Sequence, residues 1–105
     1  MIPRSQWRWD GHAGHLIISA KCRFHLNTRI GDYRISTVGD YFPDGADTPQ
    51  EIGARRTHET FVFRVSGPGG GDCDWLEIDS DVYSDCDAAR EGHMSMCLRY
   101  AKATP

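Results

Sequence analysis

A chain of 105 residues has room for one domain with a single modest core, so we expect residues 1–105 to fold as one unit. Apolar residues make up 39% of the sequence and aromatic residues 10%, which excludes disorder as a description of the whole chain. Residues 1–66 carry nine Lys or Arg against seven Asp or Glu, and residues 67–105 carry three against eight, for a net charge of −3 that argues against non-specific DNA binding.

Targeting signals are the next feature that the sequence excludes. There is no run of about eighteen apolar residues, so we expect no membrane span. The opening MIPRSQWRWD lacks the apolar stretch of a secretory signal, which predicts a cytoplasmic protein. In a reducing compartment the four cysteines are expected to be thiols or metal ligands, with two disulfides as the alternative.

The N-terminal part combines two tryptophans with a histidine-containing loop. Trp7 and Trp9 flank Arg8, and because Trp and Arg dominate interface hot spots they are candidate partner anchors. Packing over the sheet is the alternative. The stretch GHAGH then places His12 and His15 in a Gly-rich loop, and HLIIS predicts a short buried strand.

The segment CRFHLNTRIGDYRISTV predicts a β-hairpin with Gly31-Asp32 as its two-residue turn. Side chains alternate along a strand, so one face is expected to carry Cys22, Phe24, Leu26, Thr28 and Ile30. Cross-strand pairing places Arg34 opposite Arg29 and Ser36 opposite Asn27. Cys22 and His25 point to opposite faces and cannot bind one ion on a regular strand.

Downstream of Val38, GDYFPDGADTPQEIGARR predicts a loop with one helical turn at PQEIGA. THETFVFRVS predicts a strand with Phe61, Phe63 and Val65 on one face. GPGGGD is expected to be a turn, because it lacks the Gly-Lys-Ser/Thr ending of a phosphate-binding loop. WLEIDSDVY predicts a further strand.

A helix from about Asp85 to Ala101, with Ser84 as its N-cap, is the last expected element. Its buried stripe is expected to pass through Cys86, Ala89, His93, Cys97 and Tyr100. The elements together predict an α+β fold, an antiparallel sheet of four or five strands with one C-terminal helix packed on one face. We expect the helix, including Leu98, to pack against Phe24, Leu26, Phe61 and Phe63.

A structural zinc site is the first chemical hypothesis. His93 and Cys97 lie four residues apart and can bind one ion from adjacent helical turns. Cys86 lies about 10 Å earlier along the helix axis and is not expected to join them. The candidate metal ligands are therefore Cys22, Cys73, His93, Cys97, His12 and His15. Core thiols with hydrogen-bonded histidines are the alternative.

An acidic run after the Gly-rich turn is a candidate partner surface. Spaced carboxylates can imitate a row of phosphates, which predicts binding of a partner through Asp72, Asp74, Glu77, Asp79, Asp81, Asp85 and Asp87, with Trp7 and Trp9. Solubility and complementarity to the helix dipole explain the same charges as an alternative.

Catalysis stays an open question at the level of sequence. A site could be built from His12, His15, His58, Glu59, Asp79 and Asp81. However, spacing alone does not show that these groups converge, and no nucleophile elbow, HExxH helix or His-x-Glu deaminase signature is present. We therefore assign no catalytic residue and expect binding rather than turnover.

The blocks GHAGH, CRFH, STVGDYFPD, HETFVF, EID and GHMSMC resemble those of a group of small bacteriophage and prophage proteins. Members of that group often carry a longer insertion where this chain has the short loop 44–56. The group has no established activity, so the resemblance implies a phage-type origin and the cytoplasm of a host bacterium rather than a mechanism. The resemblance covers His12, His15, Cys22, His25, His93 and Cys97, which favours a shared metal or core role for them.

These observations predict a phage-type accessory protein that binds a host or defence complex, as an anti-CRISPR-type inhibitor does, through its acidic edge. Two alternatives remain. One is a small metal-dependent enzyme centred on the loop of His12 and His15. The other is a zinc-stapled nucleic-acid-binding module that uses Arg23, Arg29 and Arg34.

Overall fold

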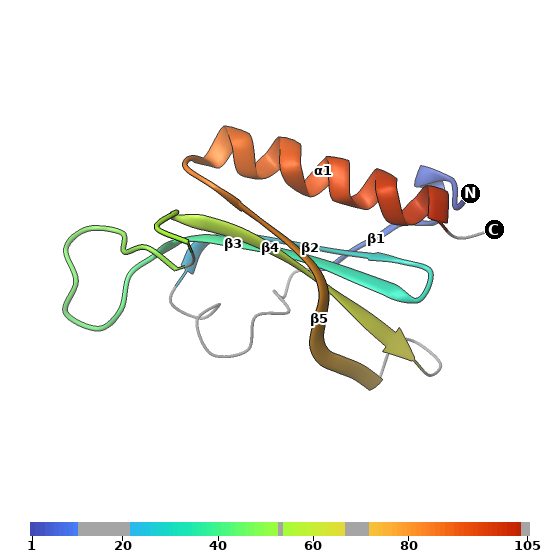
Figure 1. The fold of residues 1–105 in the computed structure, drawn as a ribbon, viewed down its shortest axis with the longest axis horizontal. Coiled ribbons are helices and arrows are strands. Elements are labelled where there is room, and N and C mark those ends of the chain that lie inside the picture. The colour runs from blue at the N-terminus through green and yellow to red at the C-terminus, as the bar shows by residue number, and fades with distance from the viewer. Residues whose placement is uncertain (11–21, 53, 67–71, 104–105) are drawn as a thin grey trace.

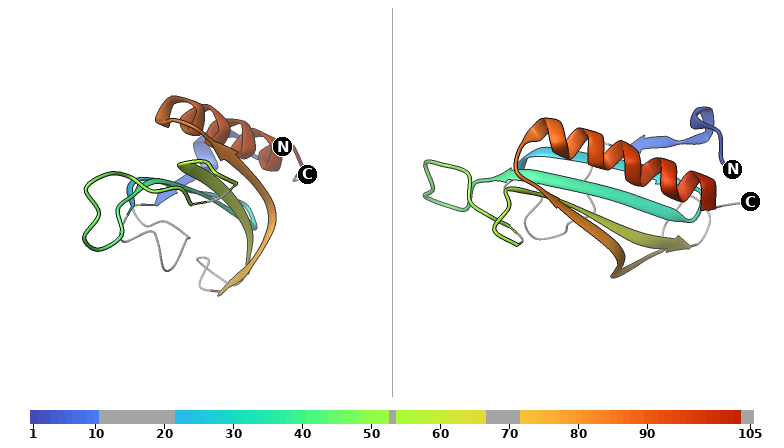
Figure 2. Two further views of the ribbon diagram at one scale, coloured as in Figure 1. Left: turned by 60° about the vertical axis from the view of Figure 1, so that its left-hand side comes forward. Right: turned by 45° about the horizontal axis from the view of Figure 1, so that its top comes forward.

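A computed structural model describes residues 1–10, 22–52, 54–66 and 72–103. Its elements are a 3-10 turn (Arg4–Gln6), β1 (Arg8–Asp10), β2 (Cys22–Ile30), β3 (Tyr33–Tyr41), β4 (His58–Ser66), β5 (Asp72–Tyr83) and α1 (Cys86–Ala103). The five strands form one antiparallel sheet in the order β1-β2-β3-β4-β5, and α1 packs on one face of it (Figure 1). The predicted α+β fold is therefore confirmed. Figure 2 shows that the sheet is curved and that α1 covers only one of its faces.

The predicted hairpin is confirmed in position and register. Gly31 adopts the positive φ of 57° that the two-residue turn requires. The pairs Arg29 with Arg34 and Asn27 with Ser36 lie opposite one another as expected. Strand β3 continues to Tyr41, beyond the predicted end at Val38.

Two local predictions are wrong. In the described part of PQEIGA there is no helical turn, because Gln50 forms an isolated β-bridge with Tyr41 and donates its N–H to the Tyr41 carbonyl at 2.7 Å. The N-cap of α1 is Asp85 rather than Ser84, since the Ala88 N–H donates to Asp85 Oδ1 at 2.8 Å. The strand predicted for HLIIS lies outside the described residues.

An apolar core lies under the C-terminal half of α1. Seven side chains that are at most 6% exposed form it: Trp7, Ile30, Ile35, Val62, Met96, Cys97 and Ala101. The expectation that Phe61 and Phe63 pack under the helix is wrong, because strand alternation places them on the opposite face from Val62. Leu98 is likewise not a core residue, with 38% of its surface exposed. Within the described residues, no helix has both the length and the apolar character needed to cross a membrane.

A buried polar layer lies under the middle of α1. His93 is 1% exposed and uses both ring nitrogens, Nε2 at 2.8 Å from the Thr28 hydroxyl and Nδ1 at 2.6 Å from the Thr37 hydroxyl. The layer continues to β4 and β5, where the Thr37 and Thr60 hydroxyls are 2.6 Å apart and the Tyr83 hydroxyl donates to Thr60 at 2.9 Å. One helical side chain is thus hydrogen-bonded to two strands at once.

The hydrogen bonds of this layer satisfy a neutral His93. A neutral imidazole carries one N–H and one lone pair on its two ring nitrogens, so it donates to one of the two threonine hydroxyls and accepts from the other. Cys97 lies in the same layer, where burial raises the pKa of its thiol to about 12 and a hydrogen bond with Thr28 works in the opposite direction. The buried imidazole therefore needs no charge.

Two further contacts hold α1 against β5. Gly92 lies directly over the Tyr83 ring, so closely that a Cβ at this position would overlap the ring atoms. Near the end of the helix, Arg99 and the Tyr100 hydroxyl both donate to Asp79 Oδ2, at 2.8 and 3.0 Å. Burial works in the opposite direction, but these hydrogen bonds hold the pKa of Asp79 below its usual value.

The close approach at Gly92 predicts a large effect of a small substitution. Gly92→Ala should destabilise the protein by about 1–3 kcal/mol despite the better helix propensity of Ala, because the methyl group overlaps the Tyr83 ring. Urea unfolding followed by circular dichroism measures the change. The control Ser95→Ala, at an exposed position of the same helix, should be neutral or stabilising. Equal stability of the two variants would contradict the packing described.

The buried His93 predicts a pH-dependent stability. Burial lowers its pKa to about 4 from the ordinary 6.5, so the unfolded state binds this proton more readily. The stabilisation is complete above pH 6.5 and is lost as the pH falls towards 4, by up to about 3 kcal/mol. Burial and Glu77 raise the pKa of Glu59 to about 7, which acts in the opposite sense.

The test is therefore the difference in unfolding free energy between the wild type and His93→Gln. We expect this difference to shrink as the pH falls from 7 to 4.5, with both proteins measured by urea unfolding. A difference that stays constant across this range would contradict a neutral, buried His93.

Candidate metal centre

Three side chains from separate elements converge beside the start of α1. Asp40 lies near the end of β3, His58 is the first residue of β4, and Cys86 is the first residue of α1. The sulfur of Cys86 is 3.4 Å from His58 Nε2 and 3.6 Å from Asp40 Oδ2, and Nε2 is 3.7 Å from Asp40 Oδ1. In the described residues this is the group of His, Cys, Asp and Glu side chains close enough to share one metal ion.

The antiparallel topology explains why these three residues meet. The pairs Gly39 with His58 and His58 with Tyr83 bring the end of β3, the start of β4 and the end of β5 to one end of the sheet. Helix α1 begins three residues after Tyr83 and therefore starts at the same end (Figure 1). Asp40 has a φ of 51°, a left-handed conformation that Asp adopts more readily than most residues.

The absence of a side chain at Gly39 leaves room for the imidazole. A Cβ at Gly39 would overlap the ring atoms of His58, so the ring lies directly over the backbone of β3. Phe24 supports the ring from β2 in an edge-on arrangement with centroids 5.2 Å apart. His58 is 2% exposed and held from two sides, which leaves little freedom for its Nε2.

Hydrogen bonds on the far side of the ring define the tautomer of His58. The Thr57 hydroxyl donates to the Ser84 carbonyl at 3.2 Å, so its oxygen is the acceptor for His58 Nδ1, 2.8 Å away. In the neutral imidazole, Nδ1 then carries the proton and Nε2 presents a lone pair towards Cys86 and Asp40. A histidine that donates from one nitrogen and exposes the other is arranged as metal-ligating histidines are.

The centre is rich in electron pairs and poor in protons. A bare Nε2, a carboxylate and a sulfur face one another, and the thiol of Cys86 supplies the proton shared among them through its hydrogen bond to Asp40. Burial, followed by the charge of Asp40, raises the pKa of Cys86 and disfavours a free thiolate nucleophile. A cation bound between them would be coordinated by all three side chains. The Asp40 side chain is 33% exposed, so the centre is open to solvent on that side.

The ligands predicted from sequence are arranged differently. Both ring nitrogens of His93 bind threonine hydroxyls, and Cys97 is fully buried and hydrogen-bonded to Thr28. Cys22 lies six residues along β2 from Thr28, about 20 Å away, so it does not meet the His93–Cys97 pair. Burial, then Glu59 and Asp40, raises the pKa of Cys22 to about 11.

Other predicted ligands and anchors have separate outcomes. His12 and His15 lie outside the described residues, as does the side chain of Cys73. Trp7 is 6% exposed and donates to the Ile2 carbonyl at 3.2 Å, so it is a core residue rather than an exposed anchor. Trp9 is 54% exposed and remains available to a partner.

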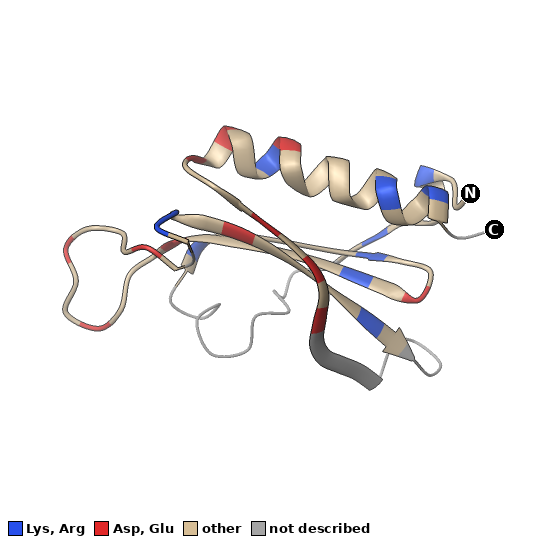
Figure 3. Cartoon of the chain, in the orientation of Figure 1, with Lys and Arg blue, Asp and Glu red and all other residues tan. Residues whose placement is uncertain are grey.

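The acidic residues of the predicted partner surface lie mainly on β5, at one edge of the sheet, and Figure 3 shows acidic positions along the described part of this strand. Glu77, Asp81, Asp85 and Asp87 are exposed, whereas Asp79 is bound by Arg99 and Tyr100. Asp72 and Asp74 pair through their backbones with β4, and their side chains lie outside the description. Arg23, one of the three arginines predicted for nucleic-acid binding, stacks on Phe42, with its guanidinium carbon 3.9 Å from the centre of the ring.

None of the three residues of the centre is among the metal ligands predicted from sequence, and His58 enters there only as a possible catalytic group. Asp40 falls in a predicted loop, and the distance between Cys86 and His93 along the predicted helix argues against Cys86 as a ligand. The signal that could have found them is positional, since Asp40, His58 and Cys86 each lie at the end of an element. In a meander of antiparallel strands, those particular ends lie together.

The chain matches no protein family, no curated protein and no solved structure. The donor set is therefore the basis for assigning chemistry. One thiolate, one imidazole and one carboxylate are ligands that zinc accepts, whereas magnesium and calcium prefer oxygen alone. Three protein ligands with a solvent-facing side leave a fourth tetrahedral position for water or another ligand.

Proposed function

We propose that this protein binds one zinc ion through Asp40, His58 and Cys86, with one coordination position open. The observation that carries the proposal is the hydrogen-bond chain from His58 Nδ1 through Thr57 to the Ser84 carbonyl, which in the neutral imidazole leaves the Nε2 lone pair facing two further metal-ligating side chains. Metal-bound Cys86 would lose its proton, because a cation stabilises the thiolate. A site with three protein ligands is of the kind that activates water or binds a substrate, rather than a closed structural site.

The proposed zinc site lies at the end of the sheet, whereas the metal-dependent enzyme predicted from sequence is centred on the loop of His12 and His15. Binding of a host or defence complex through the acidic edge stays a separate prediction. This prediction is favoured by the exposure of four carboxylates, those of Glu77, Asp81, Asp85 and Asp87. Asp79 is not part of the proposed partner surface, because its carboxylate is already bound within the chain.

Cobalt(II) in place of zinc tests the metal site directly, because thiolate-bound cobalt absorbs in the near ultraviolet and tetrahedral cobalt in the visible. We expect both bands to saturate at one equivalent in the reduced protein. Cys86→Ser should abolish the thiolate band, and His58→Gln should abolish stoichiometric binding. Thr57→Val, which removes the partner of Nδ1, should weaken binding by about 10–100-fold.

Matched controls distinguish the site from general metal affinity. His25→Gln and Asp47→Asn alter exposed residues elsewhere and should leave the titration unchanged. Gly39→Ala should weaken binding as well, because it displaces the His58 ring without removing a ligand. Cobalt bands that survive Cys86→Ser and His58→Gln together would contradict the proposed site.

A further inference from the structure

An apolar groove runs beside α1 on the side of β1 and β2. Its volume is about 380 Å³, within the range of small-ligand sites, and its walls are almost entirely apolar. The residues that line it are Trp9, Leu26, Arg90, Glu91, His93 and Met94. The indole of Trp9 is 54% exposed and tilted towards His93, with ring centroids 6.4 Å apart. A large aromatic surface is therefore available to a ligand within the groove.

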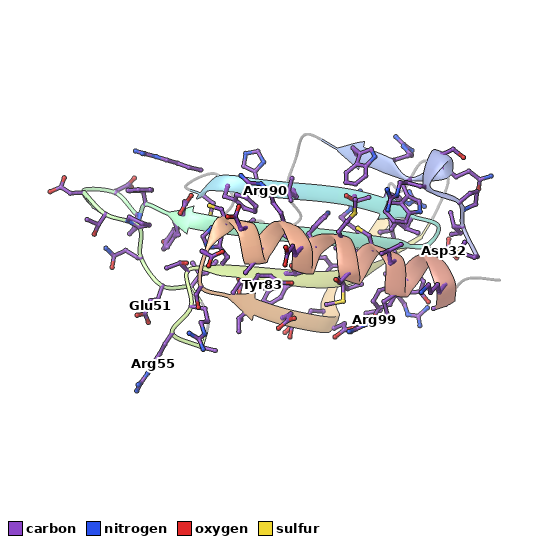
Figure 4. The ribbon with its side chains drawn as sticks, turned by 90° about the horizontal axis from the view of Figure 1, so that it is seen from above. Asp32, Glu51, Arg55, Tyr83, Arg90 and Arg99 are labelled. Atoms are coloured by element: carbon purple, nitrogen blue, oxygen red, sulfur yellow. The ribbon has the colours of Figure 1, made fainter. Side chains whose placement is uncertain are left out.

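Arg90 is the residue of this groove that lies nearest in sequence to the candidate metal centre. It lines the groove, and it lies four residues after Cys86, one turn further along the same helix. Its guanidinium carbon is 5.5 Å from the centre of the Phe24 ring, and that ring in turn contacts His58. Figure 4 shows Arg90 near the start of α1 on the β2 side.

The charge around the centre favours an anion. Zinc bound by the Cys86 thiolate and the Asp40 carboxylate has no net charge, so a further anion at the open position is not repelled. Arg90 forms an ion pair with Asp87 at 2.9 Å, but both side chains are largely exposed and such pairs contribute little. A ligand carboxylate can therefore replace Asp87. Glu91 at the groove disfavours a doubly charged phosphate.

We infer that the ligand of the open position is a carboxylate with a medium-length apolar chain. This inference rests on the proposed zinc site. The carboxylate would bind the metal and Arg90, and the chain would lie in the groove against Trp9, Leu26 and Met94. Met94 lies eight residues after Cys86, about 12 Å along the helix axis, which sets the length of chain that the groove accommodates.

Octanoate and acetate, added to the cobalt-loaded protein, test the inference. Both share the carboxylate, but only octanoate has a chain that reaches the groove. We expect octanoate to change the visible cobalt band with half-saturation at least about ten-fold below that of acetate, because burying several methylene groups adds more than the free energy of one ten-fold step.

Three variants separate the contributions. Trp9→Ala should remove most of the preference for octanoate and leave the acetate response unchanged. Arg90→Gln should weaken both responses by about ten-fold while cobalt still binds. Arg99→Gln is the matched control, because Arg99 lies towards the other end of α1 and binds Asp79, and it should change neither response (Figure 4).

The outcomes distinguish this inference from the metal site on which it rests. A normal cobalt spectrum that neither carboxylate changes overturns the ligand inference alone, as do equal affinities for acetate and octanoate. A protein that shows no cobalt bands overturns the zinc site and, with it, the ligand. A preference for octanoate that persists in Trp9→Ala overturns the placement of the chain in the groove.

Discussion

The two hydrogen bonds of the His93 imidazole are the constraint on which the rest of the structure depends. They join α1 to Thr28 of β2 and Thr37 of β3 at once, within a layer closed to water. A shift of the helix by one residue would rotate it by about 100° and break both hydrogen bonds of the buried imidazole, at a cost of about 1–3 kcal/mol for each polar group left unsatisfied. The helix therefore has one register on the sheet, whereas an entirely apolar contact would tolerate several.

That register determines the position of Cys86. Cys86 precedes His93 by seven residues, or about two turns, so both side chains lie on the same face of α1. Once His93 is bound under the middle of the helix, the Cys86 sulfur is placed at the end of the sheet, against His58 and Asp40. The three zones along α1 thus have separate roles: the apolar core stabilises the fold, the polar layer positions the helix, and the first turn supplies chemistry.

The local elements could be predicted from sequence, because each is encoded by neighbouring residues. The turn at Gly31 and the stripe through Ala89, His93 and Cys97 follow from short-range patterns, and the structure confirms both. The packing could not be predicted in the same way. An apolar helix-facing side was expected to include Phe61 and Phe63, but alternation places Thr60 there instead, with its hydroxyl bound to Thr37. The group to which a buried hydroxyl binds depends on tertiary packing, and no local sequence pattern encodes it. The same holds for the centre, whose three residues are separated by eighteen and twenty-eight positions.

We propose that Asp40, His58 and Cys86 converge on one cation because of this register. Crystals grown from reduced protein with equimolar zinc would test this most directly, by anomalous diffraction recorded on both sides of the zinc absorption edge. One strong anomalous peak per chain is expected, within about 2.0–2.3 Å of His58 Nε2, an Asp40 oxygen and the Cys86 sulfur. A peak bound instead by His93 and Cys97, or a chain whose three predicted ligands surround no metal, would contradict it.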